Sequence, residues 1–223
     1  MDTRFFYAQA TRGLLLTATS ALLVSGCATP AVNETPTSSE PTISKQTPTT
    51  VAPKAASKPP ETGETAPDFE LAAINGKKIR LSEVSKKGAV VLVMLRGYPG
   101  YQCPLCTVQV GQLMSKAKQF GAVKARVLLI YPGPAKDLKA RAEEFVKGKA
   151  MPENFDLLLD PDYTFANQYG LRWDAKNETA YPSTFVLNTA RKVLFVKVSR
   201  EHGDRAKIED VLAALVKSQP TRG

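Results

Sequence analysis

Two cysteines separated by two residues, Cys103 and Cys106, are the part of the sequence best suited to chemistry. They follow an apolar run that ends at Leu95 and precede a stretch with helical spacing, so we expect them at the start of a helix. The N–H groups and the dipole of a helix start stabilise a thiolate, and cysteines in this spacing can have a pKa well below the free value of about 8.5. Two sulfurs within one helical turn can also close a disulfide. The pair is therefore expected to cycle between dithiol and disulfide.

A static disulfide and half of a zinc site are the alternatives for this pair. Structural zinc takes about four ligands, and beyond these two cysteines the chain has only Cys27 and one histidine, His202. Attachment of haem would need a histidine after Cys106, where Thr107 stands. The composition therefore favours redox chemistry, and no cofactor is expected.

The elements that position the cysteines follow from the apolar pattern. Residues 89–95 form a Val-rich run typical of a strand buried on both faces, and residues 126–130 form a second one. Helical spacing between them continues to Gly121, and a charged helix is expected over residues 134–147. These segments predict a βαβ unit with the cysteines at its first strand-to-helix turn.

The remaining pattern predicts two hairpins and two more helices. A small hairpin is expected around Asn75-Gly76, because both residues tolerate positive φ. A short strand, a helix, an antiparallel hairpin and a closing helix follow at residues 155–160, 163–169, 183–187 with 192–198, and 208–215. The order βαβ and then ββα is that of the thioredoxin architecture, an α/β fold with a central mixed sheet and helices on both faces.

The N-terminus has the order of an export signal. Arg4 and Arg12 precede an apolar stretch of about a dozen residues, which is too short to cross a bilayer. Small residues then lead to Cys27, and residues 24–27 resemble the bacterial lipobox, which implies that Cys27 is the lipidated N-terminus. The alternative is an ordinary signal peptide with an incidental cysteine. In the lipoproteins that this segment resembles, Asp after the cysteine indicates inner-membrane retention, so Ala28 implies the periplasmic side of the outer membrane where the cell has one.

Four segments are expected along the chain. Residues 1–26 are the signal peptide, and residues 27–64 are a Pro-, Thr- and Ser-rich tether with too few large apolar residues to order itself. Residues 65–218 form the folded domain, and residues 219–223 form a tail. The formal charge of +9 comes from Lys and Arg scattered among acidic residues, without blocks or interleaved aromatics, so nucleic acid is not an expected partner.

Residues 63–216 resemble the thioredoxin superfamily, and within it the peroxiredoxin branch known as alkyl hydroperoxide reductase/thiol-specific antioxidant, or redoxin. The resemblance rests on the opening at residues 63–71, on Pro99 to Cys106, and on Tyr169-Gly170-Leu171 before residues 181–185. It implies a thioredoxin-like fold and antioxidant-type thiol chemistry.

The same resemblance implies roles for single residues. Peroxiredoxins carry Pro-x-x-x-Thr-x-x-Cys, so Pro99 and Cys106 match, with Cys106 as the peroxide-attacking thiolate and Cys103 in the threonine position. The family's peroxide-polarising arginine would fall at Pro182. A proline there matches thioredoxins instead, in which a cis-proline faces the cysteines and leaves a backbone edge free for substrate. Arg96 is the nearby cation expected to stabilise a thiolate or peroxide oxygen, unless it is a surface residue at a strand end.

The sequence therefore predicts an envelope-anchored thiol-dependent oxidoreductase that reduces disulfides or hydroperoxides. Its expected partners are a thiol reductant, a disulfide-bearing protein or a hydroperoxide, and the membrane through Cys27. If the thioredoxin pattern governs, Cys103 attacks and Cys106 resolves; if the peroxiredoxin pattern governs, Cys106 attacks. We favour the first, because both peroxide-polarising residues are replaced. The alternatives are a non-catalytic binding or metallochaperone module and a structural lipoprotein with a fixed disulfide.

Overall fold

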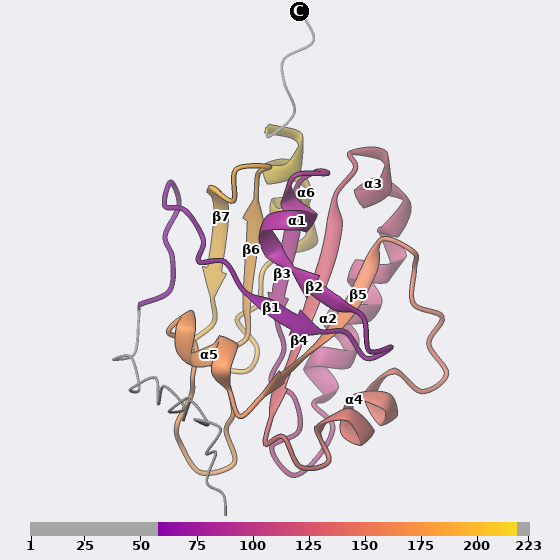
Figure 1. Cartoon of the computed structure of the whole chain (residues 1–223), viewed down its shortest axis with the longest axis vertical. Helices are drawn as coiled ribbons and strands as arrows, with labels where there is room; N and C mark the ends of the chain where they lie inside the picture. Colours follow the sequence, from indigo (N-terminus) through magenta and orange to yellow (C-terminus); the bar gives the residue numbers. More distant parts are fainter. Residues whose placement is uncertain (1–57, 218–223) are drawn as a thin grey trace, which may run out of the picture. The chain divides into compact units, whose positions relative to one another are not determined.

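The computed structural model describes residues 58–217 of the chain (Figure 1). The predicted signal peptide, the predicted lipidation site Cys27, most of the predicted tether and the predicted tail lie outside the described residues. The described residues begin at Lys58, before the predicted start of the domain at Thr65. Pro60 is buried, and the backbone groups of Gly63 and Glu64 exchange hydrogen bonds with Val193. The last residues assigned to the tether are therefore attached to the domain.

A five-stranded mixed sheet forms the centre of the domain, as predicted, in the order β5-β4-β3-β6-β7. Its strands are β3 (Val90–Met94), β4 (Arg126–Gly133), β5 (Phe155–Pro161), β6 (Ser183–Leu187) and β7 (Val193–Val198). Strands β3, β4 and β5 run parallel, whereas β6 is antiparallel to both β3 and β7. The apolar run over residues 89–95 thus forms the central strand, and every residue of β3 is buried.

Successive side chains of β3 alternate between two hydrophobic clusters, because a strand points its side chains to opposite faces of the sheet. Val91 and Val93 belong to the cluster that also holds residues of α2 (Pro104–Ser115), α3 (Ala117–Ala122), α4 (Leu138–Val146) and α6 (Ile208–Lys217). Val90 and Leu92 belong to the other cluster, which holds residues of β1 (Glu70–Ala72), β2 (Lys78–Arg80), α1 (Leu81–Ser85) and α5 (Thr164–Gln168). The sheet is therefore covered on both faces. Because both faces of β3 are buried, its sequence is apolar throughout and does not alternate with polar residues.

Two details differ from the predicted elements. The helix expected to continue to Gly121 is divided at Lys116, where the backbone leaves helical angles and α3 begins. The short helix α1 was not predicted, because five residues are too few to show helical spacing. The small hairpin is confirmed, since β1 and β2 pair antiparallel and Gly76 has a φ of +85°.

The turn between β3 and α2 contains Gly97, a position at which only glycine fits. Its φ is +68°, and a Cβ placed there would lie 2.2 Å from the carbonyl oxygen of Pro132 on β4. Any other residue would have to move one of the two central strands. The path from the central strand to Cys103 is therefore fixed by backbone packing.

Candidate active site

The two sulfurs lie at the start of α2, where the sequence placed them. Cys103 is the N-cap residue, and its Sγ accepts a hydrogen bond of 3.3 Å from the backbone N–H of Cys106. The Sγ of Cys106 in turn accepts the backbone N–H of Arg96, also at 3.3 Å. Both are free thiols, and their exposed fractions are 2% and 1%. A buried dithiol that accepts two backbone N–H groups is suited to holding negative charge on sulfur.

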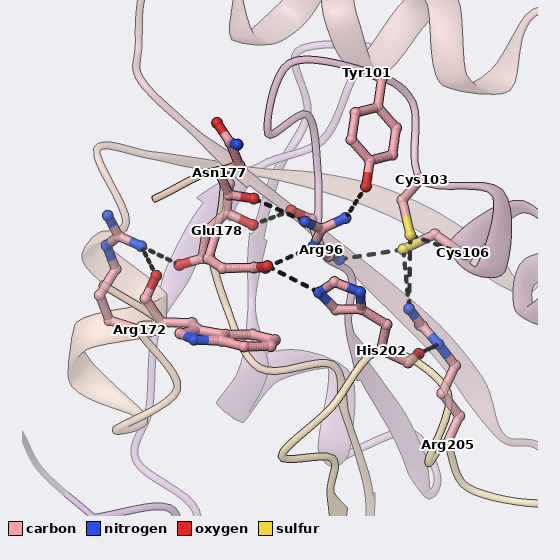
Figure 2. A network of polar contacts seen from close by, with 11 residues as sticks. Arg96, Tyr101, Cys103, Cys106, Arg172, Asn177, Glu178, His202 and Arg205 are labelled. Carbon is pink, nitrogen blue, oxygen red and sulfur yellow. Dashed lines mark hydrogen bonds and ion pairs between the residues drawn. The ribbon is translucent and has the colours of Figure 1, made fainter. Parts of the chain in front are cut away.

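Arg205 supplies the cation at the dithiol, and the sequence analysis did not identify it. Its Nη2 lies 3.7 Å from the Sγ of Cys103 and 3.6 Å from the Sγ of Cys106 (Figure 2). The guanidinium is held by two further contacts, from Nη1 to Gln109 Oε1 at 2.5 Å and from Nε to the carbonyl oxygen of His202 at 3.0 Å. A single guanidinium therefore faces both sulfurs in a fixed orientation.

The surroundings of the two thiols push their pKa values apart. A hydrogen bond from the Cys106 thiol lowers the pKa of Cys103 to about 5, against the effect of burial, and the Cys106 N–H, Arg205 and Arg96 add to this. The same hydrogen bond and burial raise the pKa of Cys106 well above its usual value. At neutral pH, Cys103 is the thiolate and Cys106 the thiol, which is the arrangement of a nucleophile with a resolving partner.

The sequence left open whether Arg96 is an exposed residue at a strand end or a cation of the site, and the structure shows that it is buried. Its side chain is 3% exposed, and Nε donates to Glu178 Oε2 at 2.7 Å. The other guanidinium nitrogens donate to the hydroxyl of Tyr101 at 2.9 Å and to the carbonyl oxygen of Asn177 at 2.7 Å (Figure 2). Arg96 thus contacts Cys106 through its backbone N–H, while its side chain ties the loop before α2 to the loop that carries Asn177 and Glu178.

Pro182 is buried at the start of β6, but the free backbone edge expected beside it is not present. Its carbonyl oxygen accepts the N–H of Ser199 at 2.9 Å. The N–H of Tyr181 donates to Leu171, and the carbonyl of Tyr181 accepts the hydroxyl of Ser183. These groups are engaged because β7 and the segment around Leu171 pack along this edge. A role of Pro182 in the site stays a prediction.

The rim of the site carries exposed apolar side chains and a polar chain behind them. Tyr101, Leu105 and Val108 are 50%, 41% and 56% exposed.

His202, to which the sequence analysis gave no role, lies 2.9 Å from Glu178 Oε1. Within residues 58–217, no group of three or more His, Cys, Asp or Glu side chains is placed to hold a metal ion.

Known proteins show the same combination of fold and site region. The AhpC/TSA family model matches residues 62–196. The chain belongs to the AhpC/TSA family. A putative peroxiredoxin of Mycobacterium tuberculosis is 32% identical over 157 residues, which cover 70% of this chain and 96% of that protein.

Other relatives of this AhpC/TSA chain include both kinds of thiol enzyme. The thiol-disulfide oxidoreductase ResA of Bacillus subtilis is 27% identical over 72% of this chain and 79% of its own length. The crystal structure of peroxidoxin BcpB from Mycobacterium tuberculosis has a TM-score of 0.58 and 30% identity, covering 71% of this chain and 98% of that one. These similarities confirm the predicted thioredoxin-like fold and the predicted class of enzyme, a thiol-disulfide oxidoreductase or peroxiredoxin-like thiol peroxidase.

Reaction with iodoacetamide should reveal the low pKa of Cys103 in this AhpC/TSA domain. Only the thiolate reacts, so the alkylation rate of Cys103 is expected to reach half its maximum near pH 5. Arg205→Gln removes the cation, so the midpoint should move to higher pH by about one unit. Arg200→Gln, in the same loop, removes an exposed charge that stacks on Tyr181 and should leave the midpoint unchanged. Equal midpoints for the Arg205 variant and wild type, measured by mass spectrometry of the Cys103 peptide, would contradict this role.

Proposed function

We propose that this chain reduces disulfide bonds in exported proteins, with Cys103 as the nucleophile and Cys106 as the resolving thiol. The observation that carries the proposal is the environment of Cys103. Its sulfur caps α2, accepts the Cys106 N–H and faces Arg205 at 3.7 Å. These contacts favour a thiolate on Cys103, whose neighbours in the chain include the exposed residues Tyr101 and Leu105.

The reaction balances as two exchanges of disulfide bonds. The Cys103 thiolate attacks one sulfur of the substrate disulfide, forming a mixed disulfide and releasing the other substrate sulfur as a thiolate, which takes a proton. Cys106 then loses its proton and attacks Cys103, which closes the Cys103–Cys106 disulfide and releases the second substrate thiol. Two electrons have passed to the substrate. A thiol reductant, either a protein dithiol or a small thiol, returns the enzyme to the dithiol state by the reverse exchange.

The experiment that tests this function measures oxidation of the dithiol by two substrates in parallel. Purified reduced protein is mixed with an unfolded disulfide-bonded protein or with hydrogen peroxide, and free thiols are trapped at intervals and counted by mass. We expect faster loss of both thiols with the protein disulfide at equal concentration. Loss only with peroxide would overturn the proposal.

Reduction of hydroperoxides is the second candidate function, and the position of Arg205 is the observation that favours it. Its Nη2 lies 3.6 Å from Cys106 Sγ, so a cation is present although Pro182 replaces the family's arginine. In this reaction Cys106 attacks the terminal peroxide oxygen, the O–O bond breaks and an alcohol or water leaves. The sulfenic acid on Cys106 then condenses with the Cys103 thiol to form a disulfide and water. The raised pKa of Cys106 makes this the second choice.

We further propose that the protein is anchored to the cell envelope by lipid on Cys27, which lies outside the described residues. The lipobox resemblance at residues 24–27 and the charged and apolar segments before it support this. Residues 58–217 contain no helix long and apolar enough to cross a membrane.

Cys27→Ser tests the anchor. It should move the protein from the membrane pellet to the soluble fraction, because one diacylglyceryl group gives the chain its membrane affinity. Mass spectrometry of the wild-type N-terminal peptide should show the added lipid. A conservative change nearby, Thr29→Ser, should leave the distribution unaltered. A Cys27→Ser protein that still pellets, together with wild type lacking lipid mass, would rule out the anchor.

A further inference from the structure

A cavity of about 330 Å³ opens at the end of the sheet opposite the dithiol. Its wall includes Gly88 and Ala89 before β3 and Lys124 to Arg126 at the start of β4, whereas the cysteines follow the other end of β3. Helices α1 and α3, which both contribute residues to the wall, lie at the end of the sheet where β3 begins (Figure 1). The cavity is therefore separate from the candidate active site.

The lining of this cavity is strongly basic. It holds six cations and a single carboxylate, namely Lys77, Lys78, Arg80, Lys87, Lys124, Arg126 and the acidic Glu83. Glu83 is already paired with Lys86, 2.8 Å away, so it does not neutralise the cavity. The lining thus attracts an anion.

Three of the six cations are held by carboxylates outside the cavity. Lys78 and Arg80 bind Glu70 at 3.2 and 2.9 Å, and Arg126 binds Asp156 at 2.5 Å. The other three, Lys77, Lys87 and Lys124, form no ion pair with any part of the chain between residues 58 and 217. These three exposed lysines are the charges available to a ligand.

The wall that carries two of these lysines is fixed by backbone packing. A Cβ on Gly88 would lie 2.1 Å from the carbonyl oxygen of Lys124, so only glycine lets the two segments approach this closely. The backbone that carries Lys87 is therefore held close to the backbone of Lys124. The floor is apolar, with Ile79, Ala89 and Ala125 buried beneath the charges.

We propose that this cavity binds a phosphate group carried on an aliphatic or glycerol-like stem. Lysine ammonium groups are compact donors that bind phosphate as point charges. Three unpaired lysines are enough to neutralise one phosphate monoester, which carries a charge of about −1.5 to −2 at pH 7. The apolar floor accommodates the stem. The described residues that line the cavity include no aromatic ring, so nothing there would stack a nucleobase. The ligand is either a soluble phosphate ester or the headgroup of an anionic phospholipid.

The test uses the full chain with Cys27→Ser, so that no acyl group contributes to binding. Inorganic phosphate and glycerol 3-phosphate are titrated by calorimetry, and vesicles of phosphatidylglycerol or phosphatidylcholine are used in co-sedimentation. Lys77→Gln, Lys87→Gln and Lys124→Gln are combined in one variant. The control variant combines Lys136→Gln, Lys147→Gln and Lys176→Gln, which removes the same charge from exposed sites outside the cavity.

Each outcome decides the proposal. Saturable binding of glycerol 3-phosphate, lost only in the cavity variant, supports a soluble ester as the ligand. Binding only to phosphatidylglycerol vesicles, reduced about 100-fold in the cavity variant and much less in the control, supports a lipid headgroup. No binding of either kind, or equal losses in the two variants, overturns the proposal. Dithiol oxidation should be unchanged in the cavity variant, so this result is independent of the function proposed above.

Discussion

Cys103→Ser is expected to slow the reaction with protein disulfides by roughly 1000-fold or more, because it removes the cysteine of the dithiol that is a thiolate at neutral pH. Burial still raises the pKa of the remaining Cys106 in this variant, so Cys106 is a poor nucleophile at neutral pH. Cys106→Ser keeps the proposed nucleophile but removes the proposed resolving thiol. This second variant should therefore accumulate a mixed disulfide with the substrate, visible as a covalent adduct on a non-reducing gel.

The two serine variants control for each other, because they make the same isosteric change at neighbouring buried positions. Urea unfolding should show that both remain folded. If Cys103→Ser instead forms a sulfenic acid rapidly with hydrogen peroxide, and Cys106→Ser traps no partner, then Cys106 is the nucleophile. The peroxidase mechanism would replace the proposed one, with Arg205 acting on Cys106.

Arg205 also shows what the sequence could not predict about this site. The cysteine pair was predictable because its position depends on local signals, an apolar strand, a glycine turn and a helix start. Arg205 reaches the sulfurs from the loop between β7 and α6, 99 residues after Cys106 in the chain. A loop has no hydrophobic periodicity, so nothing in the sequence distinguishes Arg205 from the other arginines of this basic chain. Only the packing of α6 against the sheet places this one at the dithiol.

Arg96 illustrates the same limit in a different way. Its position at the end of β3 was predictable, but the direction of its side chain depends on Asn177 and Glu178, which lie in a loop without a regular pattern. The fold itself was largely predictable, because β3, β4 and both hairpins carry clear apolar runs or turn residues. The free backbone edge at Pro182 was expected from resemblance alone, and tertiary packing closes it through Ser199.

The ion pair of Arg96 and Glu178, which is largely shielded from solvent, leads to the second large effect. Glu178→Ala should lower the free energy of unfolding by about 3–5 kcal/mol at pH 7, because it leaves the guanidinium of Arg96 buried without its anion. The side chains of the pair are only 3% and 11% exposed. Asp174→Asn breaks a pair in the same loop, between Asp174 and Arg172, but Asp174 is 90% exposed. That control should cost less than about 1 kcal/mol in urea unfolding.

The pH dependence of this loss separates an ion pair from a simple packing defect. Burial alone would raise the pKa of Glu178, but hydrogen bonds from Arg96 and His202 hold it below its usual value. A carboxylate with a lowered pKa in the folded state contributes stability that is fully present above its unfolded pKa, about 4.3, and is lost as the pH falls through the folded value. The difference between wild type and Glu178→Ala should therefore be largest above the unfolded pKa of the carboxyl and should shrink below about pH 4. A difference that does not change with pH would mean that Glu178 stabilises the loop by packing, and that Arg96 holds its position next to Cys106 without it.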